Sequence, residues 1–250
     1  MGSDDIHLEI GLLAFEGLDQ ADLTGPFEVL ARLPNSTTRI YAKTLDPVRD
    51  MQGLRLLPDA TLAEAPQHDV LHVPGGYGQE AVMHDGTTLA WVQHQAANAR
   101  YVLSVCTGAL ICGAAGLLKE RRATTHWSAL HLLPFFGAVP VDERVVVDGS
   151  MVFAAGVTSG IDGALRLAAL LRGDDVARAL SAICTGAALR QWDAGNGAAG
   201  RARCRPSLGR GDYGAARGDC APCRTAPRHR RVTLSARRGV SAFCSNGGLS

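Results

Sequence analysis

Short apolar runs alternate with amphipathic segments along the first 184 residues of the chain. The apolar runs have the length of buried strands and are bounded by Gly, Pro or charged residues; they lie at residues 7–15, 38–45, 69–78, 99–105 and 144–156. Helices are expected at residues 22–34, 89–99, 107–118 and 159–172. Strands that alternate with helices predict an α/β fold, with a mostly parallel sheet covered by helices on both faces.

Two details refine this pattern. The run at 144–156 reads as a hairpin that turns at Asp148-Gly149, and the run at 69–78 enters a Gly-rich turn. In the first helical segment, Pro26 suits a first helical turn, and Asp22 lies where an Asp often caps a helix. Ligands bind beyond the carboxyl ends of parallel strands, so the turns at 16–25, 74–78 and 106–108 are expected to form the site.

Charge divides the chain more sharply than hydropathy does. Residues 1–184 hold 13 Lys and Arg against 21 Asp and Glu, whereas residues 185–250 hold 12 Arg against 3 Asp. We therefore predict one α/β domain over residues 1–184 and a basic tail over residues 185–250. The tail is rich in Arg, Gly and Pro and poor in apolar residues, which favours disorder. Its positive charge could hold nucleic acid only loosely, without sequence preference.

No apolar run approaches the ~20 residues that a membrane-spanning helix needs. The first residues, MGSDDIHLEIGLL, carry acidic groups where a secretory signal would carry positive ones. The expectation is a cytoplasmic protein with no membrane partner.

Cys106 is the residue with the clearest chemical possibilities. It directly follows the strand YVLSV and directly precedes a helix, a junction that resembles a nucleophile elbow, although the G-x-S-x-G sequence is absent. The N–H groups of the helix start would favour its thiolate form. A packed structural thiol is the competing interpretation, since free Cys is often buried. Cys112 lies among apolar helix residues and is expected to be such a structural thiol.

Two further turns contribute candidates. The backbone amides of Gly75 and Gly76 could bind developing negative charge, or the pair could simply form a tight turn. Asp22 and Glu16 are the two carboxyl groups expected near Cys106, and Asp22 competes with its own interpretation as a helix cap.

Five stretches in register make the chain similar to the ThiJ/PfpI superfamily and, within it, to the isocyanide hydratases: DLTGP (22–26), PGGYG (74–78), ARYVLSVCTGALICGAAGLL (99–118), RATTHW (122–127), and ERVVVDG with AAGVTSGID (143–149 and 154–162). The resemblance covers roughly residues 6–180. It implies a flavodoxin-like three-layer sandwich with a cysteine elbow, in a protein that forms homodimers.

The resemblance also implies site roles. Cys106 matches the nucleophile, Asp22 the acid and base that bonds the thiol, and Thr107 the threonine beside the cysteine. Gly75 and Gly76 match the backbone amides near the reacting carbon. His126, in TTHW, is expected to act indirectly, as a hydrogen-bonded neighbour of the site rather than as a base.

The reaction of that branch adds water to an isocyanide and gives an N-substituted formamide. A thiolate attacks the terminal carbon to give a thioimidate, a carboxylic acid protonates that carbon, and water displaces the sulfur. One thiol and one carboxyl suffice, so neither a metal nor an organic cofactor is expected. A buried carboxyl with a raised pKa would suit this work near neutral pH.

Other functions in the superfamily stay open. Peptidase-like members carry His directly after the cysteine, and Thr107 in that position disfavours peptidase chemistry. A glyoxalase or deglycase pairs a cysteine with a carboxylate as well. Some transcription regulators join such a domain to a helix-turn-helix pair, but residues 185–250 lack the helical apolar period that such a pair needs.

The tail departs from the family. No family-like continuation follows about Ala182, and its Arg, Ala, Gly and Pro bias is what a shifted reading frame gives in GC-rich DNA, so a frameshift is our hypothesis for it. Cys220 and Cys223, with Cys204, Cys244 and His229, lack the second Cys or His pair of a zinc site, so no metal is expected there.

Overall fold

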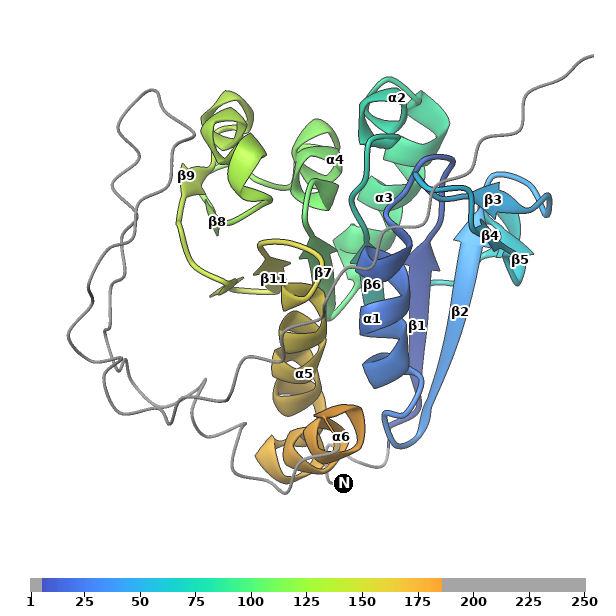
Figure 1. Ribbon diagram of the computed structural model, residues 1–250, viewed down its shortest axis with the longest axis vertical. Coiled ribbons are helices and arrows are strands. Elements are labelled where there is room, and N and C mark those ends of the chain that lie inside the picture. Colours follow the sequence, from blue (N-terminus) through green and yellow to red (C-terminus); the bar gives the residue numbers. More distant parts are fainter. Residues whose placement is uncertain (1–5, 186–250) are drawn as a thin grey trace, which may run out of the picture. The chain divides into compact units, whose positions relative to one another are not determined.

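A computed structural model describes residues 6–185 of this chain, and the basic tail therefore lies outside the described residues. The described part is built around one large sheet with strand order β10-β11-β7-β6-β1-β2-β5 (Figure 1). The strands are β1 (Leu8–Leu13), β2 (Ser36–Ala42), β5 (Ala60–Thr61), β6 (Val70–Val73), β7 (Tyr101–Val105), β10 (Val145–Asp148) and β11 (Met151–Ala154). Two small ribbons pair β3 (Val48–Arg49) with β4 (Arg55–Leu56) and β8 (Arg122–Ala123) with β9 (Val139–Pro140).

The large sheet is parallel except at one edge. Its central strands pair in parallel, with Leu12 opposite His72 and His72 opposite Leu103. Only β10 runs antiparallel, because it is joined to β11 by the predicted tight turn at Asp148-Gly149. This order is what crossover helices require, and it confirms the predicted α/β fold.

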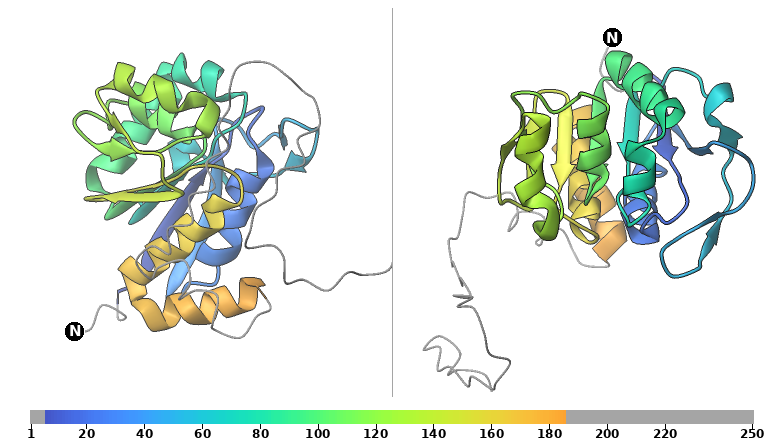
Figure 2. Two further views of the ribbon diagram at one scale, coloured as in Figure 1. Left: turned by 60° about the vertical axis from the view of Figure 1, so that its left-hand side comes forward. Right: turned by 90° about the horizontal axis from the view of Figure 1, so that it is seen from above.

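Helices cover both faces of the sheet (Figure 2). Helix α5 (Ser159–Arg172) packs against α1 (Gln20–Leu30), α6 (Asp174–Thr185) and the strands β7 and β11 on one face. On the other face, α4 (Gly108–Ala114) lies against α2 (Gln79–Met83), α3 (Gly86–Asn98) and a 3-10 segment at Trp127–Phe136. The domain is therefore a three-layer sandwich, and the turns that lead into α1, α2 and α4 meet at one sheet edge.

Most elements fall where the sequence predicts them, with one informative error. Helix α5 has the predicted bounds, but α1 begins at Gln20, six residues before Pro26, so Pro26 lies inside the helix instead of in its first turn. The reason is the cap: the side chain of Asp19 accepts a hydrogen bond from the Ala21 N–H and starts the helix early. Helix α6 was not predicted: it follows α5 after the single residue Gly173, which the sequence indicates as a helix end.

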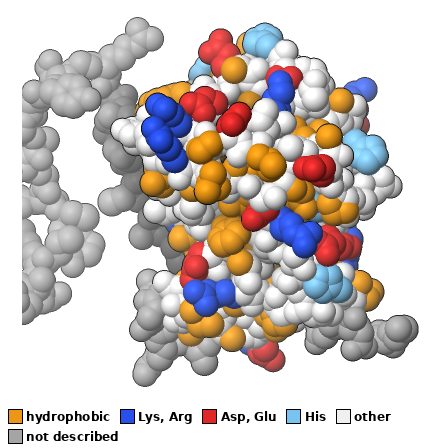
Figure 3. Space-filling view, turned by 90° about the vertical axis from the view of Figure 1, so that its right-hand side faces the viewer, with side chains coloured by type: hydrophobic (Ala, Val, Ile, Leu, Met, Phe, Trp, Pro, Cys, Tyr) orange, Lys and Arg blue, Asp and Glu red, His pale blue; other side chains and the backbone are white. Residues whose placement is uncertain are grey.

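The described surface mixes apolar and charged groups. On the face shown in Figure 3, hydrophobic side chains lie among Lys, Arg, Asp and Glu side chains. Among the large apolar side chains that stay exposed are Leu54, Leu57, Tyr77, Trp127 and Phe135. Within residues 6–185, no helix is both long enough and apolar enough to cross a membrane.

Candidate active site

Cys106 occupies the turn between β7 and α4 in a backbone conformation that is rare for a residue with a side chain. Its φ of 56° lies in the left-handed region, which costs about 1–3 kcal/mol for a non-glycine residue. Two hydrogen bonds hold the turn: the Cys106 N–H donates to the Ala154 carbonyl at 2.9 Å, and the Thr125 hydroxyl donates to the Cys106 carbonyl at 2.7 Å. The surrounding structure thus imposes the sharp strand-to-helix turn of a nucleophile elbow.

Asp22 lies in the first turn of α1 and is fully buried. Because Asp19 already caps the helix, Asp22 is free of the capping role that its position suggested. Its Oδ2 accepts a hydrogen bond from the Gly75 N–H at 3.2 Å, and its carboxyl group interacts with the Cys106 thiol. Its Oδ1 has no N–H or O–H partner within the described part of the chain. This oxygen is therefore not engaged by another donor among the described residues.

The Gly75-Gly76 turn is hydrogen-bonded both to Asp22 and to Thr107, the residue after Cys106. The Gly76 N–H donates to the Thr107 hydroxyl oxygen at 3.0 Å, while the Gly75 N–H is bonded to Asp22. Both amides thus lie beside residues expected at the reacting centre, and their binding of developing negative charge stays a prediction. Gly76 has a φ of 125°, so the tight-turn interpretation applies to it as well.

The two reacting candidates have strongly shifted pKa values. Burial, with a smaller contribution from the negative charge of Asp19, raises the pKa of Asp22 from 3.8 to about 7. Burial and then the charge of Asp22 raise the pKa of Cys106 from 9.0 to about 12. The raised pKa of Asp22 agrees with the expectation for a proton carrier that works near neutral pH.

The direction of the Cys106 shift corrects a prediction. The helix start was expected to lower the pKa of the thiol, and the Thr107 backbone does act in that direction. Loss of solvation and the neighbouring carboxylate outweigh it, since α4 contains only seven residues and Cys106 is only 7% exposed. Burial and the neighbouring carboxyl group therefore both favour the thiol form of Cys106 over the thiolate.

The remaining candidates have other partners. The Nδ1 of His126 pairs with the Ser128 hydroxyl at 2.7 Å, and its ring lies beside Gly156 in the turn before α5. Glu16 is exposed, and its carboxylate accepts a hydrogen bond from the Arg49 N–H. Cys112 is fully buried in α4, as the sequence predicts. Of the two carboxyl groups considered, it is Asp22 that meets Cys106.

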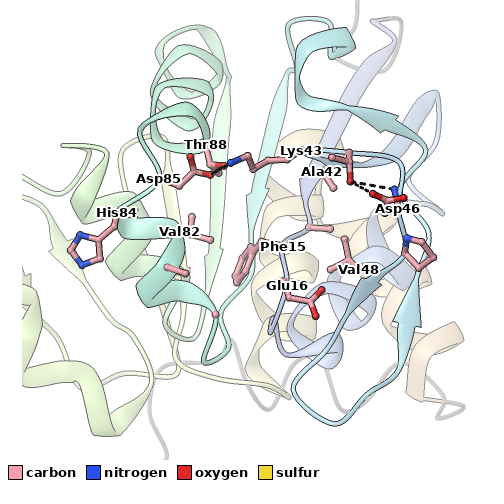
Figure 4. Close-up of a pocket in the computed structure, with 15 residues that line it drawn as sticks. Phe15, Glu16, Ala42, Lys43, Asp46, Val48, Val82, His84, Asp85 and Thr88 are labelled. Carbon is pink, nitrogen blue, oxygen red and sulfur yellow. Dashed lines mark hydrogen bonds and ion pairs between the residues drawn. The ribbon is translucent and has the colours of Figure 1, made fainter.

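A separate cavity of about 570 Å³ lies beyond the ends of β1 and β2 (Figure 4). Apolar side chains including Phe15, Val48 and Val82 line it, and a 3.0 Å ion pair joins Lys43 of one wall to Asp85 of the other. Neither Cys106, Asp22 nor Thr107 belongs to its lining. The cavity therefore does not mark the reacting centre, which the hydrogen bonds around Cys106 define better.

Two residues that hold this centre were missed by the sequence reasoning. Thr125 belongs to the RATTHW stretch, in which the sequence indicates a role only for its neighbour His126. His72 lies in β6, and its imidazole Nε2 is 2.9 Å from the Asp22 carbonyl oxygen. A signal for His72 was present: Pro26 lies four residues after Asp22 and has no N–H for that carbonyl.

The close packing at Gly75 leads to a testable prediction. An added Cβ at this position would lie 2.6 Å from the Thr107 nitrogen and 2.9 Å from the Cys106 Cβ. Gly75→Ala is therefore expected to displace the elbow, with a loss of about 1–3 kcal/mol in the free energy of unfolding. Urea denaturation measures this loss, and Gly86→Ala, where a Cβ meets nothing within 4 Å, is the matched control. Equal stability of the two variants would contradict the packing described here.

Comparisons with known proteins converge on one family. The sequence description of the DJ-1/PfpI family matches residues 9–170. The isonitrile hydratase of Pseudomonas putida is 51% identical over 171 residues, which cover 68% of this chain and 75% of that protein; isonitrile is another word for isocyanide. The HTH-type transcriptional regulator GbdR of Pseudomonas aeruginosa is 30% identical, over 69% of this chain and 49% of the regulator. Among solved structures, a ThiJ/PfpI family protein from Pseudomonas syringae has a TM-score of 0.70 and 40% identity, covering 72% of this chain and 75% of that one.

Proposed function

This chain belongs to the DJ-1/PfpI family, and on that premise we propose that it is an enzyme that hydrates an isocyanide to an N-substituted formamide. Cys106 is the nucleophile and Asp22 the proton carrier. The observation that carries the proposal is the buried contact between the Cys106 thiol and an Asp22 carboxyl whose pKa is raised to about 7. The 51% identity with an isonitrile hydratase supports the same reaction.

The first step joins the isocyanide and the enzyme without loss of atoms. The terminal carbon of R–N≡C accepts both the sulfur and a proton, so one S–H group adds across a single carbon. Asp22 takes the thiol proton as the sulfur attacks and delivers it to that same carbon, which gives the thioimidate R–N=CH–S–Cys106. A carboxyl group with a pKa near 7 is suited to both halves of this transfer.

The second step returns the enzyme to its starting state. Asp22, again a carboxylate, removes a proton from water as the water oxygen attacks the thioimidate carbon. Asp22 passes that proton to the nitrogen, then takes the hydroxyl proton of the tetrahedral intermediate and gives it to the sulfur as the C–S bond breaks, so R–NH–CHO leaves and the thiol is restored. The net reaction adds one water to the isocyanide to give the formamide. Each step uses only the thiol, the carboxyl group and water.

The other residues of the site hold these two groups. Thr107 is bonded to Gly76 and the Gly75 amide to Asp22, so both restrict the geometry in which the proton moves. His126 stands beside Gly156 and is assigned an indirect role.

We also propose that the protein acts as a homodimer in the cytoplasm. The family resemblance supports the homodimer, and the free cysteines at 106, 112 and 184 suit a reducing compartment.

The direct test is incubation of the purified full chain with cyclohexyl isocyanide. The expected product is N-cyclohexylformamide; in ¹⁸O-water it carries the label in its carbonyl oxygen, and in D₂O it carries deuterium on the formyl carbon. Mass spectrometry of protein quenched with acid is expected to show the intact substrate mass added to the Cys106 peptide. A rate of formamide production no greater than that of buffer would refute the proposal, and turnover of methylglyoxal alone would move the assignment to glyoxalase or deglycase chemistry.

A further inference from the structure

We infer that His72 is a positioning residue, whose ring holds the main-chain carbonyl of Asp22 and so fixes the carboxyl group against Cys106. The inference rests on the proposed function for its chemical meaning, since it concerns the same thiol and carboxyl pair. The first observation is a missing N–H donor within α1, which the sequence already shows at Pro26.

Pro26 creates the need for a donor. In an α-helix, the carbonyl of a residue accepts a hydrogen bond from the N–H four positions later, and for Asp22 that position is Pro26, which has no N–H. The Asp22 carbonyl is in the buried first turn of α1, where an unpaired acceptor costs about 1–3 kcal/mol. A partner from outside the helix is therefore required.

His72 supplies that partner from the neighbouring strand. Its ring is fully buried, and its Nε2 lies 2.9 Å from the Asp22 carbonyl oxygen. Burial lowers the pKa of His72 to about 4, so the ring is neutral near pH 7 and carries one proton. Its other nitrogen lies 3.2 Å from the carbonyl of Leu103, a residue paired with strands on both sides in the sheet. We therefore assign the Nε2–H tautomer, which donates to the carbonyl whose usual helical partner is replaced by Pro26.

One short segment consequently holds Asp22 at two points. The ring of His72 holds its main-chain carbonyl, and three residues later the Gly75 N–H holds its carboxylate. Both contacts come from the end of β6, which pairs directly with β7, the strand that leads to Cys106. Loss of the first contact frees the turn of α1 that carries Asp22, and the carboxyl group then moves relative to the sulfur.

The consequence is a measurable change at Cys106. The Asp22 carboxylate is one of the groups that raise the pKa of Cys106, so a displaced carboxylate lets that pKa fall. His72→Leu, which removes the donor at similar volume, is expected to raise the rate at which iodoacetamide alkylates Cys106 at pH 9 about tenfold, as a fall of about one unit in its pKa would. Its kcat for cyclohexyl isocyanide is expected to fall about 10- to 100-fold, with KM changed less than about threefold.

Three further variants separate positioning from mere stability. His72→Gln keeps an N–H donor and is expected to restore both readouts to near the wild-type values. His68→Leu removes another buried histidine, which packs against Tyr41 and Trp91 instead of Asp22, and is expected to lower stability but leave both readouts unchanged. Pro26→Ala, added to His72→Leu, gives the helix back its own N–H for the Asp22 carbonyl and is expected to recover much of the lost kcat.

The experiment measures alkylation of the Cys106 peptide by mass spectrometry from pH 6 to 11, beside isocyanide turnover, on full-length protein whose folding is checked by circular dichroism. If His72→Leu matches His68→Leu in both readouts, or if His72→Gln is as impaired as His72→Leu, the positioning role is wrong. Because alkylation needs no substrate, it separates the two proposals. An absence of turnover in wild type with the expected alkylation pattern would refute the hydration but leave the positioning role standing.

Discussion

Replacing Cys106 with alanine is expected to abolish formation of the formamide, with a fall in kcat of at least about 10³-fold. A hydroxyl cannot form the thioimidate: that of Thr107, the residue after Cys106, is engaged with both backbone groups of Gly76 and is a far weaker nucleophile. Cys106→Ser is expected to be equally inactive, because the hydroxyl of serine is much harder to deprotonate next to a carboxyl group of pKa about 7. The measurement is N-cyclohexylformamide production followed by chromatography.

Cys112→Ala provides the matched control for that loss. Cys112 is fully buried in α4, six residues from the nucleophile, and its thiol interacts with Ser104. Its replacement is expected to retain turnover and to lower the free energy of unfolding by about 1 kcal/mol, through the small cavity that it leaves. Retained activity in Cys106→Ala, or activity lost equally in Cys112→Ala, would contradict the assignment of the nucleophile.

The fold could be predicted from the sequence because its signals are local. The apolar runs at 99–105 and 144–156 have the length of buried strands, and the turn at Asp148-Gly149 forces the antiparallel edge. The predicted start of α1 was wrong because both Asp19 and Asp22 could cap the helix. Only the structure shows that Asp19 is the cap. The predicted basic tail lies outside the described residues, so the frameshift hypothesis for it stays a prediction.

The site was only partly predictable, because its key interactions join distant parts of the chain. Cys106 could be found from its place between a strand and a helix, and Asp22 from the family resemblance. The contacts of Asp22 with Gly75 and with His72 span 53 and 50 residues, respectively, so no local pattern reports them. The direction of the pKa shift of Cys106 was predicted wrongly for a related reason. The sequence shows where the helix starts, but it does not show the burial that contributes most to this pKa.

Asp22→Asn is expected to separate catalysis from stability, since the carboxyl group that carries the proton is also an unfavourable buried charge. Without a group that can release and return a proton, kcat is expected to fall about 10²- to 10⁴-fold. The fold, in contrast, is expected to gain stability at alkaline pH, where the wild-type protein must keep a buried carboxylate.

The pH dependence of that gain follows from the pKa values. The pKa of Asp22 is about 7 in the folded protein against 3.8 in the unfolded chain, so the folded state binds the proton more tightly. Below about pH 4 both states hold the proton and the carboxyl group costs nothing. As the pH rises through 4 to 7, the unfolded chain releases its proton first and stability falls; above 7 the full cost of about 4 kcal/mol applies. Asparagine has no such proton, so the variant lacks this loss.

Urea denaturation of wild type and Asp22→Asn at pH 4.5 and pH 8.5 measures the effect. The stability of the variant relative to wild type is expected to increase by a few kcal/mol between the two pH values. The buried His68 and His72, whose pKa values are lowered to about 4, destabilise both proteins equally as the pH falls, and therefore cancel in the comparison. A difference that does not change with pH would mean that Asp22 titrates as an ordinary aspartate, and a carboxyl group of that kind could not protonate the isocyanide carbon near neutral pH.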